Sequence, residues 1–253
     1  MAESKILFDN GTHKCIMFSI DDETHEEKFL SVNQYLLIQD GAGILIDPGS
    51  DSIFHELCDA VSQYIPIDKI KFVFFSHQDP DVAGSISHWS VSTSTKLVMS
   101  SIWVRFMSHY GVLDIDRVFS IPDKGTQIPF GEGYLMFLPA HFLHSPGNFS
   151  LYDSQSKILF SGDIGAAVVP PMAVYKEIDS FEAHLPYLES FHKRYMSSNK
   201  VCKAWVKSVL KQNISVIAPQ HGAVFRDEDV KRFLHWFENL ACGSDLIDEL
   251  YEV

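Results

Sequence analysis

Cysteine is scarce in this sequence, with four residues in 253 and no C-x-x-C pair. The missing pair excludes a built-in rubredoxin or zinc-ribbon module, because both hold their metal through paired thiolates. In a chain without a signal peptide, scattered cysteines such as Cys15, Cys58, Cys202 and Cys242 are typical of reduced thiols. We therefore expect a cytoplasmic protein.

Long apolar segments are also missing. The first residues, "MAESKILFDNGTHK", lack the basic start and apolar core of a signal peptide. No later segment approaches the ~20 apolar residues that a membrane-spanning helix needs. Export and membrane insertion are therefore not expected.

Positive charge is in short supply. The chain has 20 Lys and Arg residues against 33 Asp and Glu residues, so its net charge is -13. Proteins that bind the phosphates of nucleic acids carry basic patches instead. A local run of lysines (Lys200, Lys203, Lys207 and Lys211) has helical spacing, which is typical of a solvated helix face. We expect no nucleic-acid partner.

The first half of the chain begins with patterns typical of consecutive strands. After them, strand patterns alternate with helix patterns. Strands are expected over residues 15–20, 33–39, 43–49, 70–76 and 96–101. Helices are expected over residues 51–65, 81–90 and 102–110. The segment "DGAG", residues 40–43, predicts a hairpin turn between two of the strands.

The second half repeats the order of strands before helices. Strands are expected over residues 125–130, 133–140, 148–153, 157–163 and 215–220. Helices are expected over residues 179–196, 203–211 and 226–240. A capping box from Asp179 to Glu182 is expected to open the first of these helices.

The two successive blocks predict an α/β fold in which two sheets pack face to face with helices outside, a four-layer αββα sandwich. No linker rich in Pro, Gly or Ser separates the blocks. A chain of this length can also bury one large core. We therefore expect a single domain over residues 1–253.

Potential metal ligands follow the ends of several predicted strands. They are three histidines and three aspartates: His77, Asp79, Asp81, His144, Asp163 and His221. Loops at one end of a sandwich are common places for functional sites. Three imidazoles and three carboxylates can hold two metal ions if one carboxylate is shared between them.

A single H-x-D-x-D motif is most often a solvated turn, but here five short contexts agree. They are "LIDPG", "SHQDPD", "FLHSPGN", "LFSGD" and "APQHG", each at the end of a predicted strand. In order and in local sequence they resemble the metallo-β-lactamase superfamily, and within it the di-iron lineage of flavodiiron proteins. The resemblance covers nearly the whole chain and implies a sandwich of the metallo-β-lactamase type.

The resemblance also implies a role for each candidate ligand. The first metal would be held by His77, Asp79 and His144, and the second by Asp81 and His221. The carboxylate of Asp163 would bridge the two ions. A further aspartate, Asp47 in "LIDPG", matches a structural position that bonds the backbone of the metal loop.

The sequence departs from the hydrolases of the superfamily, which use H-x-H-x-D-H. Asp79 stands where those enzymes have their second histidine, and Val82 where they have their last. Carboxylates and imidazoles in equal number favour iron or manganese over zinc, and the resemblance implies two iron ions. Without a ligand at Val82, the second metal keeps open positions for a small molecule such as O2.

Two functions from different classes follow from this resemblance. Flavodiiron proteins reduce O2 or NO with a flavodoxin-like domain that follows the lactamase-like one, and because this sequence ends at Val253 we expect no FMN-binding domain in it. The first hypothesis is an oxygen-binding di-iron protein that acts as an oxygen sensor, because the chain resembles a short flavodiiron-like group that serves bacterial chemotaxis. The alternative is an O2 or NO reductase that receives electrons from a separate donor.

A third interpretation, a zinc-dependent hydrolase, is less consistent with the ligand set. The expected partners are O2 or NO and either a signalling protein or an external electron donor. By resemblance alone, we expect a homodimer.

Overall fold

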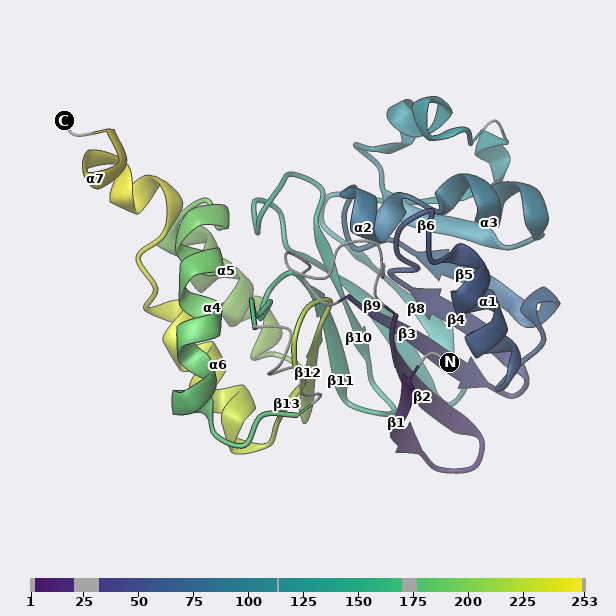
Figure 1. Ribbon diagram of the computed structural model, residues 1–253, viewed down its shortest axis with the longest axis horizontal. Helices are drawn as coiled ribbons and strands as arrows, with labels where there is room; N and C mark the ends of the chain where they lie inside the picture. Colours follow the sequence, from purple (N-terminus) through teal and green to yellow (C-terminus); the bar gives the residue numbers. More distant parts are fainter. Residues whose placement is uncertain (1–2, 21–31, 113, 170–176, 252–253) are drawn as a thin grey trace.

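Two β-sheets pack against each other in the computed structural model, with helices on both outer sides (Figure 1). The structure describes residues 3–20, 32–112, 114–169 and 177–251. The helices α1 to α3 lie on one side and α4 to α6 on the other. The predicted four-layer αββα arrangement is confirmed.

The first sheet has seven strands in chain order. They are β1 (Glu3–Asp9), β2 (His13–Ser19), β3 (Asn33–Gln39), β4 (Ala42–Ile46), β5 (Ile70–Phe74), β6 (Lys96–Ser100) and β7 (Val118–Ile121). Strands β1 to β4 pair antiparallel, and β4 to β7 pair parallel. The predicted turn joins β3 to β4 through Asp40 and Gly41, both at positive φ, as two-residue hairpins prefer.

Short helices connect the parallel strands of this sheet. They are α1 (Phe54–Ser62), α2 (Pro80–Ala83) and α3 (Ile86–Ser92), with 3-10 turns η1 (Ile67–Lys69), η2 (Val104–Tyr110) and η3 (Ile115–Arg117). The helix expected over 81–90 is divided, because the backbone N–H and hydroxyl of Ser85 both bond to the Gly49 carbonyl. The helix expected over 102–110 is a 3-10 helix instead.

The second sheet has six strands in the order β13-β12-β11-β10-β9-β8. They are β8 (Thr126–Phe130), β9 (Gly133–Pro139), β10 (Phe149–Asp153), β11 (Ile158–Gly162), β12 (Val216–Pro219) and β13 (Phe225–Arg226). The first four form an antiparallel meander, and β11 pairs parallel to β12. The parallel pairing brings the carboxyl ends of β11 and β12 to the same edge of the sheet.

Helices cover the outer face of the second sheet. They are α4 (Phe181–Tyr195), α5 (Asn199–Val209) and α6 (Glu228–Glu238), followed by η5 (Gly243–Leu246) and α7 (Ile247–Tyr251). The residue that caps α4 is Ser180, whose Oγ accepts a hydrogen bond from the Ala183 N–H at 3.2 Å, so the capping box predicted at Asp179 is wrong by one residue. None of the described helices is both long and apolar enough to cross a membrane.

The apolar core lies in three layers, between the two sheets and beneath each set of helices. Strand β2 shows why both faces of the first sheet must be apolar. Ile16 and Phe18 pack toward the helices, while Cys15 and Met17 face the second sheet, and all four are fully buried. Because strands buried on both faces need continuous apolar runs, the sequence "CIMF" fits this central position.

Candidate metal centre

The six predicted ligands come from four separate segments of the chain. His77, Asp79 and Asp81 lie between β5 and α2 or at the start of α2, and His144 lies between β9 and β10. Asp163 directly follows β11, and His221 follows β12. The structure brings the six side chains together at one edge of the sandwich.

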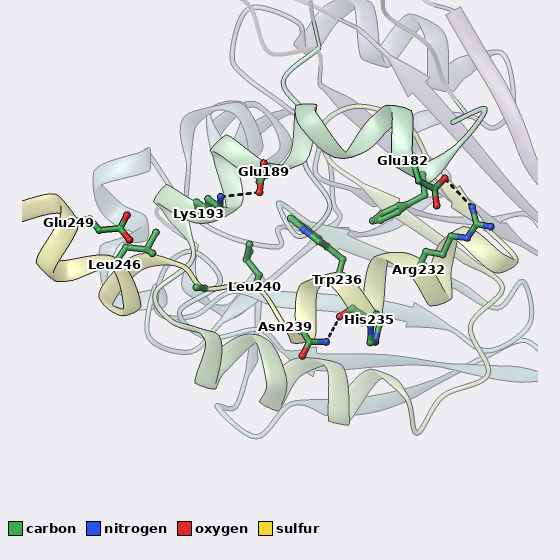
Figure 2. A pocket seen from close by; sticks show the side chains of 12 residues that line it. Glu182, Glu189, Lys193, Arg232, His235, Trp236, Asn239, Leu240, Leu246 and Glu249 are labelled. Atoms are coloured by element: carbon green, nitrogen blue, oxygen red, sulfur yellow. Dashed lines mark hydrogen bonds and ion pairs between the residues drawn. The ribbon is translucent and has the colours of Figure 1, made fainter.

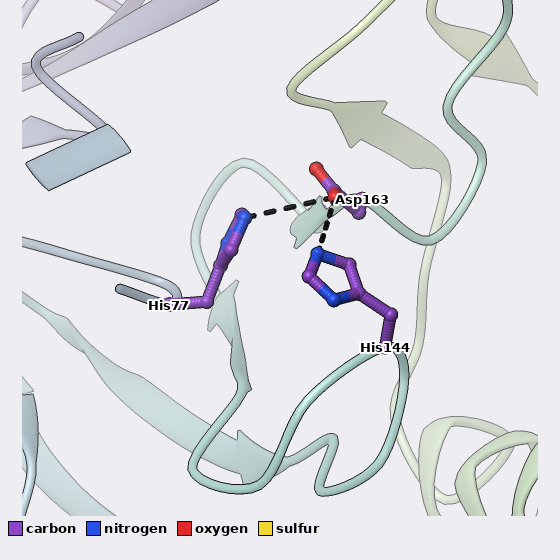
Figure 3. Close-up of side chains that lie close together, drawn as sticks. All are labelled: His77, His144 and Asp163. Atoms are coloured by element: carbon purple, nitrogen blue, oxygen red, sulfur yellow. Dashed lines mark ion pairs between the residues drawn. The ribbon is translucent and has the colours of Figure 1, made fainter. Parts of the chain in front are cut away.

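One oxygen of Asp163 lies within a first group of side chains (Figure 3). Its Oδ2 is 3.0 Å from His144 Nε2 and 3.6 Å from His77 Nε2. Asp79 Oδ2 lies 3.3 Å from the same His144 nitrogen and 4.0 Å from His77 Nε2. Two imidazole nitrogens and two carboxylate oxygens therefore surround one small volume.

The other oxygen of Asp163 faces a second group. Its Oδ1 is 3.5 Å from His221 Nε2, which in turn is 3.2 Å from Asp81 Oδ2. The two oxygens of one carboxylate are thus directed at two different sets of ligands. This is the geometry that a carboxylate shared by two metal ions requires.

Buried polar atoms without a hydrogen bond show that the centre fits cations. His77 Nε2 and Asp163 Oδ1 are both buried and have no hydrogen-bond partner. The hydroxyl of Ser76, 2.9 Å from His77 Nδ1, fixes the imidazole so that Nε2 points into the cluster. Since burying an unpaired polar atom is costly, a metal ion that binds both atoms would remove that cost.

The electrostatics of the centre also favour added positive charge. Burial raises the pKa of Asp163, but the His77, His144 and His221 imidazoles outweigh it and hold this pKa below its ordinary value. Burial would lower the pKa of His144, yet the carboxylates of Asp163 and Asp79 raise it to about 10. His144 therefore carries a proton at neutral pH when no metal is bound. A metal ion would displace that proton, so metal binding releases it and weakens in acid.

Two other residues that the sequence singled out, Asp47 and Val82, are not among the six candidate ligands. The carboxylate of Asp47 accepts a hydrogen bond from the Ser76 N–H at 2.8 Å, which confirms its predicted contact with the backbone of the metal loop. Burial raises the pKa of Asp47 to about 6. Val82 is fully buried in the apolar layer beneath the first set of helices.

Another histidine, His141, has structural contacts close to the centre. Its Nε2 lies 2.8 Å from the Asp123 carbonyl, and its Nδ1 accepts a hydrogen bond from the Gly147 N–H at 3.1 Å. It therefore ties down the loop that carries His144.

The sequence did not identify two residues of α4 that contact segments carrying the candidate ligands. The ring of Tyr195 lies edge-on to that of His144 at 5.9 Å, and His192 accepts a hydrogen bond from the Gly165 N–H. Neither residue belongs to a recognisable motif. The available signal was weak: histidines at positions 184 and 192 on the buried face of a predicted helix.

A separate cavity of about 680 Å³ lies between α4, α6 and the segment leading to α7 (Figure 2). Four of its charged side chains form two pairs: Lys193 Nζ is 2.9 Å from Glu189, and Arg232 is 3.3 Å from Glu182. None of the six clustered side chains lines it. The cavity is therefore separate from the cluster of six candidate ligands.

Two solved structures of the chemotaxis sensor ODP are similar to this chain over nearly its whole length. The apo state of the chemotaxis sensor ODP from T. denticola is 44% identical, with a TM-score of 0.89, and the match covers 99% of each chain. The peroxy diiron species of the chemotaxis sensor ODP is 43% identical with a TM-score of 0.88, covering 98% of this chain and 100% of that one. A mutant of the flavo di-iron protein from Thermotoga maritima is 22% identical with a TM-score of 0.79, covering 94% of this chain and 61% of that one, which shows the fold alone.

Curated relatives match over a similar length of this chain but are longer. An uncharacterised protein of Methanocaldococcus jannaschii is 27% identical over 228 residues, which are 87% of this chain and 56% of that protein. The chain spans about half the length of the curated relatives it matches. Residues 30–222 match the family described as ODP family beta lactamase. The chain therefore belongs to the ODP family of β-lactamase-fold proteins.

Proposed function

We propose that this protein is a non-haem di-iron protein that binds O2 and acts as an oxygen sensor in chemotaxis signalling. The observation that carries the proposal is its similarity to the chemotaxis sensor ODP, at 43–44% identity over 98–99% of this chain. One of those structures is of a peroxy diiron species. The arrangement of the candidate ligands around both oxygens of Asp163 supports the two-metal part of this proposal.

We assign the first iron to His77, Asp79 and His144. The second iron would be held by Asp81 and His221, and Asp163 would be the carboxylate shared by the two. Equal numbers of imidazoles and carboxylates suit iron better than zinc. When bound, the two ions supply the electrons and the open coordination positions that O2 requires. Ser76, Asp47 and His141 hold the ligand-bearing loops in place. Val82 has no atom that could bind a metal.

The alternative function is an O2 or NO reductase with an external electron donor. It uses the same six ligands, and it is supported by relatives such as the anaerobic nitric oxide reductase flavorubredoxin of Aeromonas hydrophila. That relative is only 23% identical, and this chain covers 44% of it. The greater identity to the sensor favours the first function.

One experiment separates the two functions. The protein is loaded anaerobically with two Fe²⁺ ions per chain, mixed with O2 and followed by its visible absorption. A sensor gives an oxygenated form that persists and turns over once. Rapid decay of that form, with repeated consumption of O2 or NO when reduced rubredoxin supplies electrons, would contradict the sensor function and support the reductase.

We also propose that the protein acts in the cytoplasm as a homodimer, with a signalling protein as its partner. Four free cysteines support a reducing compartment. Exposed apolar side chains on α7, namely Ile247, Leu250 and Tyr251, support association with another chain. Light scattering on the purified protein tests the homodimer, and a monomer at micromolar concentration would contradict it.

A further inference from the structure

The turn that follows the bridging carboxylate has an unusual hydrogen-bond partner. Most of its backbone N–H groups bond to carbonyl oxygens: Ile164 to Ser161, Ala166 to Asp163, and Ala167 to His221. The N–H of Gly165 instead donates to a side chain, His192 Nε2, at 2.9 Å. This histidine comes from α4, which supplies none of the six ligands.

The contacts of His192 fix which of its nitrogens carries a proton. Its Nδ1 lies 2.7 Å from the Leu188 carbonyl in the preceding turn of α4, so Nδ1–H donates there. The Nε2 lone pair is then free to accept from Gly165. The side chain is fully buried, and burial lowers the pKa of His192 to about 4, so the ring is neutral at neutral pH.

The packing around His192 leaves the ring little freedom. Its centroid lies 5.3 Å from that of Trp236 and 5.6 Å from that of Phe237, both in edge contacts from α6. Phe191, its neighbour on α4, makes a third edge contact at 5.4 Å. A rigid helix pair therefore holds the acceptor nitrogen at a fixed position beside the turn.

We infer that His192 is a positioning residue for the metal centre, holding the Asp163 turn through the Gly165 N–H so that both carboxylate oxygens keep their directions. The inference rests on the proposed di-iron function. The same turn bonds to the His221 backbone through Ala167, so its position affects ligands of both ions. A neutral acceptor also suits the place, because a carboxylate there would add negative charge near Asp163.

Loss of the acceptor leaves the Gly165 N–H buried without a partner, and the turn must move to reach another. Groups that orient metal ligands typically change metal affinity by about 10–100-fold when removed. Since Asp163 serves both ions, we expect both affinities to fall together. A purely structural histidine would change the stability of the fold but not this affinity.

The test compares two variants whose new side chains have similar lengths. His192→Gln keeps an oxygen that can accept the Gly165 N–H, whereas His192→Met fills a similar volume without a comparable acceptor. His184→Met is the matched control, because His184 is another buried histidine of α4 that packs against Tyr187 and Phe225. Each protein is titrated anaerobically with Fe²⁺ against a coloured chelator, and magnetic coupling between the two ions is measured at saturation.

The expected result is that His192→Met binds both ions at least about tenfold more weakly. The same variant is expected to show altered magnetic coupling. Both His192→Gln and His184→Met should stay close to the wild type. Wild-type affinity and coupling in a folded His192→Met protein would overturn the inference. Failure of the wild type to bind two ions would instead overturn the proposed function.

If His192→Met does not fold, nitrogen NMR of the wild-type protein tests the hydrogen bond on which the inference depends. The inference requires a neutral His192 with its proton on Nδ1 and a hydrogen bond from Gly165 to Nε2. A proton on Nε2 at neutral pH would overturn it.

Discussion

At the scale of single residues, Asp163 connects the two halves of the centre. Its Oδ2 lies near His144 and His77, while its Oδ1 lies near His221. Among the ion pairs described, Asp81 pairs with His221 alone, although one of its oxygens also lies within 4.8 Å of ligand atoms of His77 and Asp79. The two aspartates should therefore have different effects when they are removed.

We predict that Asp163→Ala loses both iron ions, because it removes the shared ligand. Asp81→Ala should lose mainly the second ion and keep close to one per chain. The measurement is iron content after anaerobic loading and removal of unbound metal, with circular dichroism as a check on folding. Equal iron retention in the two variants would contradict the ligand assignment.

Gly222, directly after His221, limits where that ligand can lie. Its φ is +81°, and a Cβ added there would lie 2.7 Å from the Ala167 Cβ. We predict that Gly222→Ala lowers the free energy of unfolding by about 1–3 kcal/mol through strain. The shift of the backbone should also weaken the second iron site.

The matched control is Gly41→Ala, because Gly41 has a similar φ of +74° but open space around the added Cβ. Urea unfolding and Fe²⁺ titration of both variants separate strain from displacement. If both variants bind iron equally well, the contact with Ala167 has no role in placing His221.

At the scale of elements, the sequence predicts the interior strands of the first sheet well and its two edge strands poorly. Strands β2 to β6 have the apolar runs that burial on both faces demands. The edge strands β1 and β7 were not predicted, because each has one strand neighbour and mixed exposure: Ile6 in β1 is 48% exposed. The division between α2 and α3 depends on the contact of Ser85 with Gly49, which is distant in sequence.

The candidate ligands could be predicted because each lies in a short motif at a strand end. His192 could not, because its partner is a backbone N–H, 27 residues away, that any residue except proline would offer. A contact of this kind leaves no pattern in one sequence. Loop ligands are thus readable from sequence, whereas the groups that hold the loops require the structure.

The buried histidines of α4 predict a pH dependence. Burial lowers the pKa of His184 and His192 to about 4, below the ~6.5 of an unfolded chain. Between these values the unfolded state binds protons that the folded state excludes, so stability is full above pH 6.5 and falls as pH drops toward 4. Between pH 7 and pH 5 the expected effect is on the order of 2 kcal/mol for each histidine.

Urea unfolding of the metal-free protein at pH 7 and pH 5 measures this effect. Asp47 acts in the opposite sense, because burial raises its pKa to about 6 and its contribution is lost as pH rises through that value. Both wild type and His184→Met contain Asp47, so its contribution cancels when their free energies of unfolding are subtracted. An identical pH dependence in both proteins would show that His184 does not titrate as described.

At the scale of the whole molecule, we propose that the chain forms one domain over residues 1–253. The layer between the sheets combines side chains from both, and the Tyr35 hydroxyl of β3 donates to the Pro219 carbonyl of β12 at 2.6 Å. A buried pair also joins the sheets, with His13 Nε2 of β2 lying 2.6 Å from Asp153 Oδ2 of β10. These contacts should make the two sheets unfold together.

We predict a single unfolding transition for the metal-free protein, seen equally by far-ultraviolet circular dichroism and by tryptophan fluorescence. Asp153→Ala should keep one transition and lower the free energy of unfolding by about 1–3 kcal/mol, because the buried Ser156 hydroxyl and the His13 ring lose their hydrogen-bond partner. Two separate transitions in the wild type would contradict the single domain.

The central claim is that this centre holds iron and meets O2 as a sensor. The most direct measurement is metal analysis of protein made in iron-supplemented cells, followed by anaerobic reduction and addition of O2. The account predicts two iron ions per chain and an absorption change that persists after one equivalent of O2. Two zinc ions and no iron, or rapid and repeated O2 consumption, would contradict it.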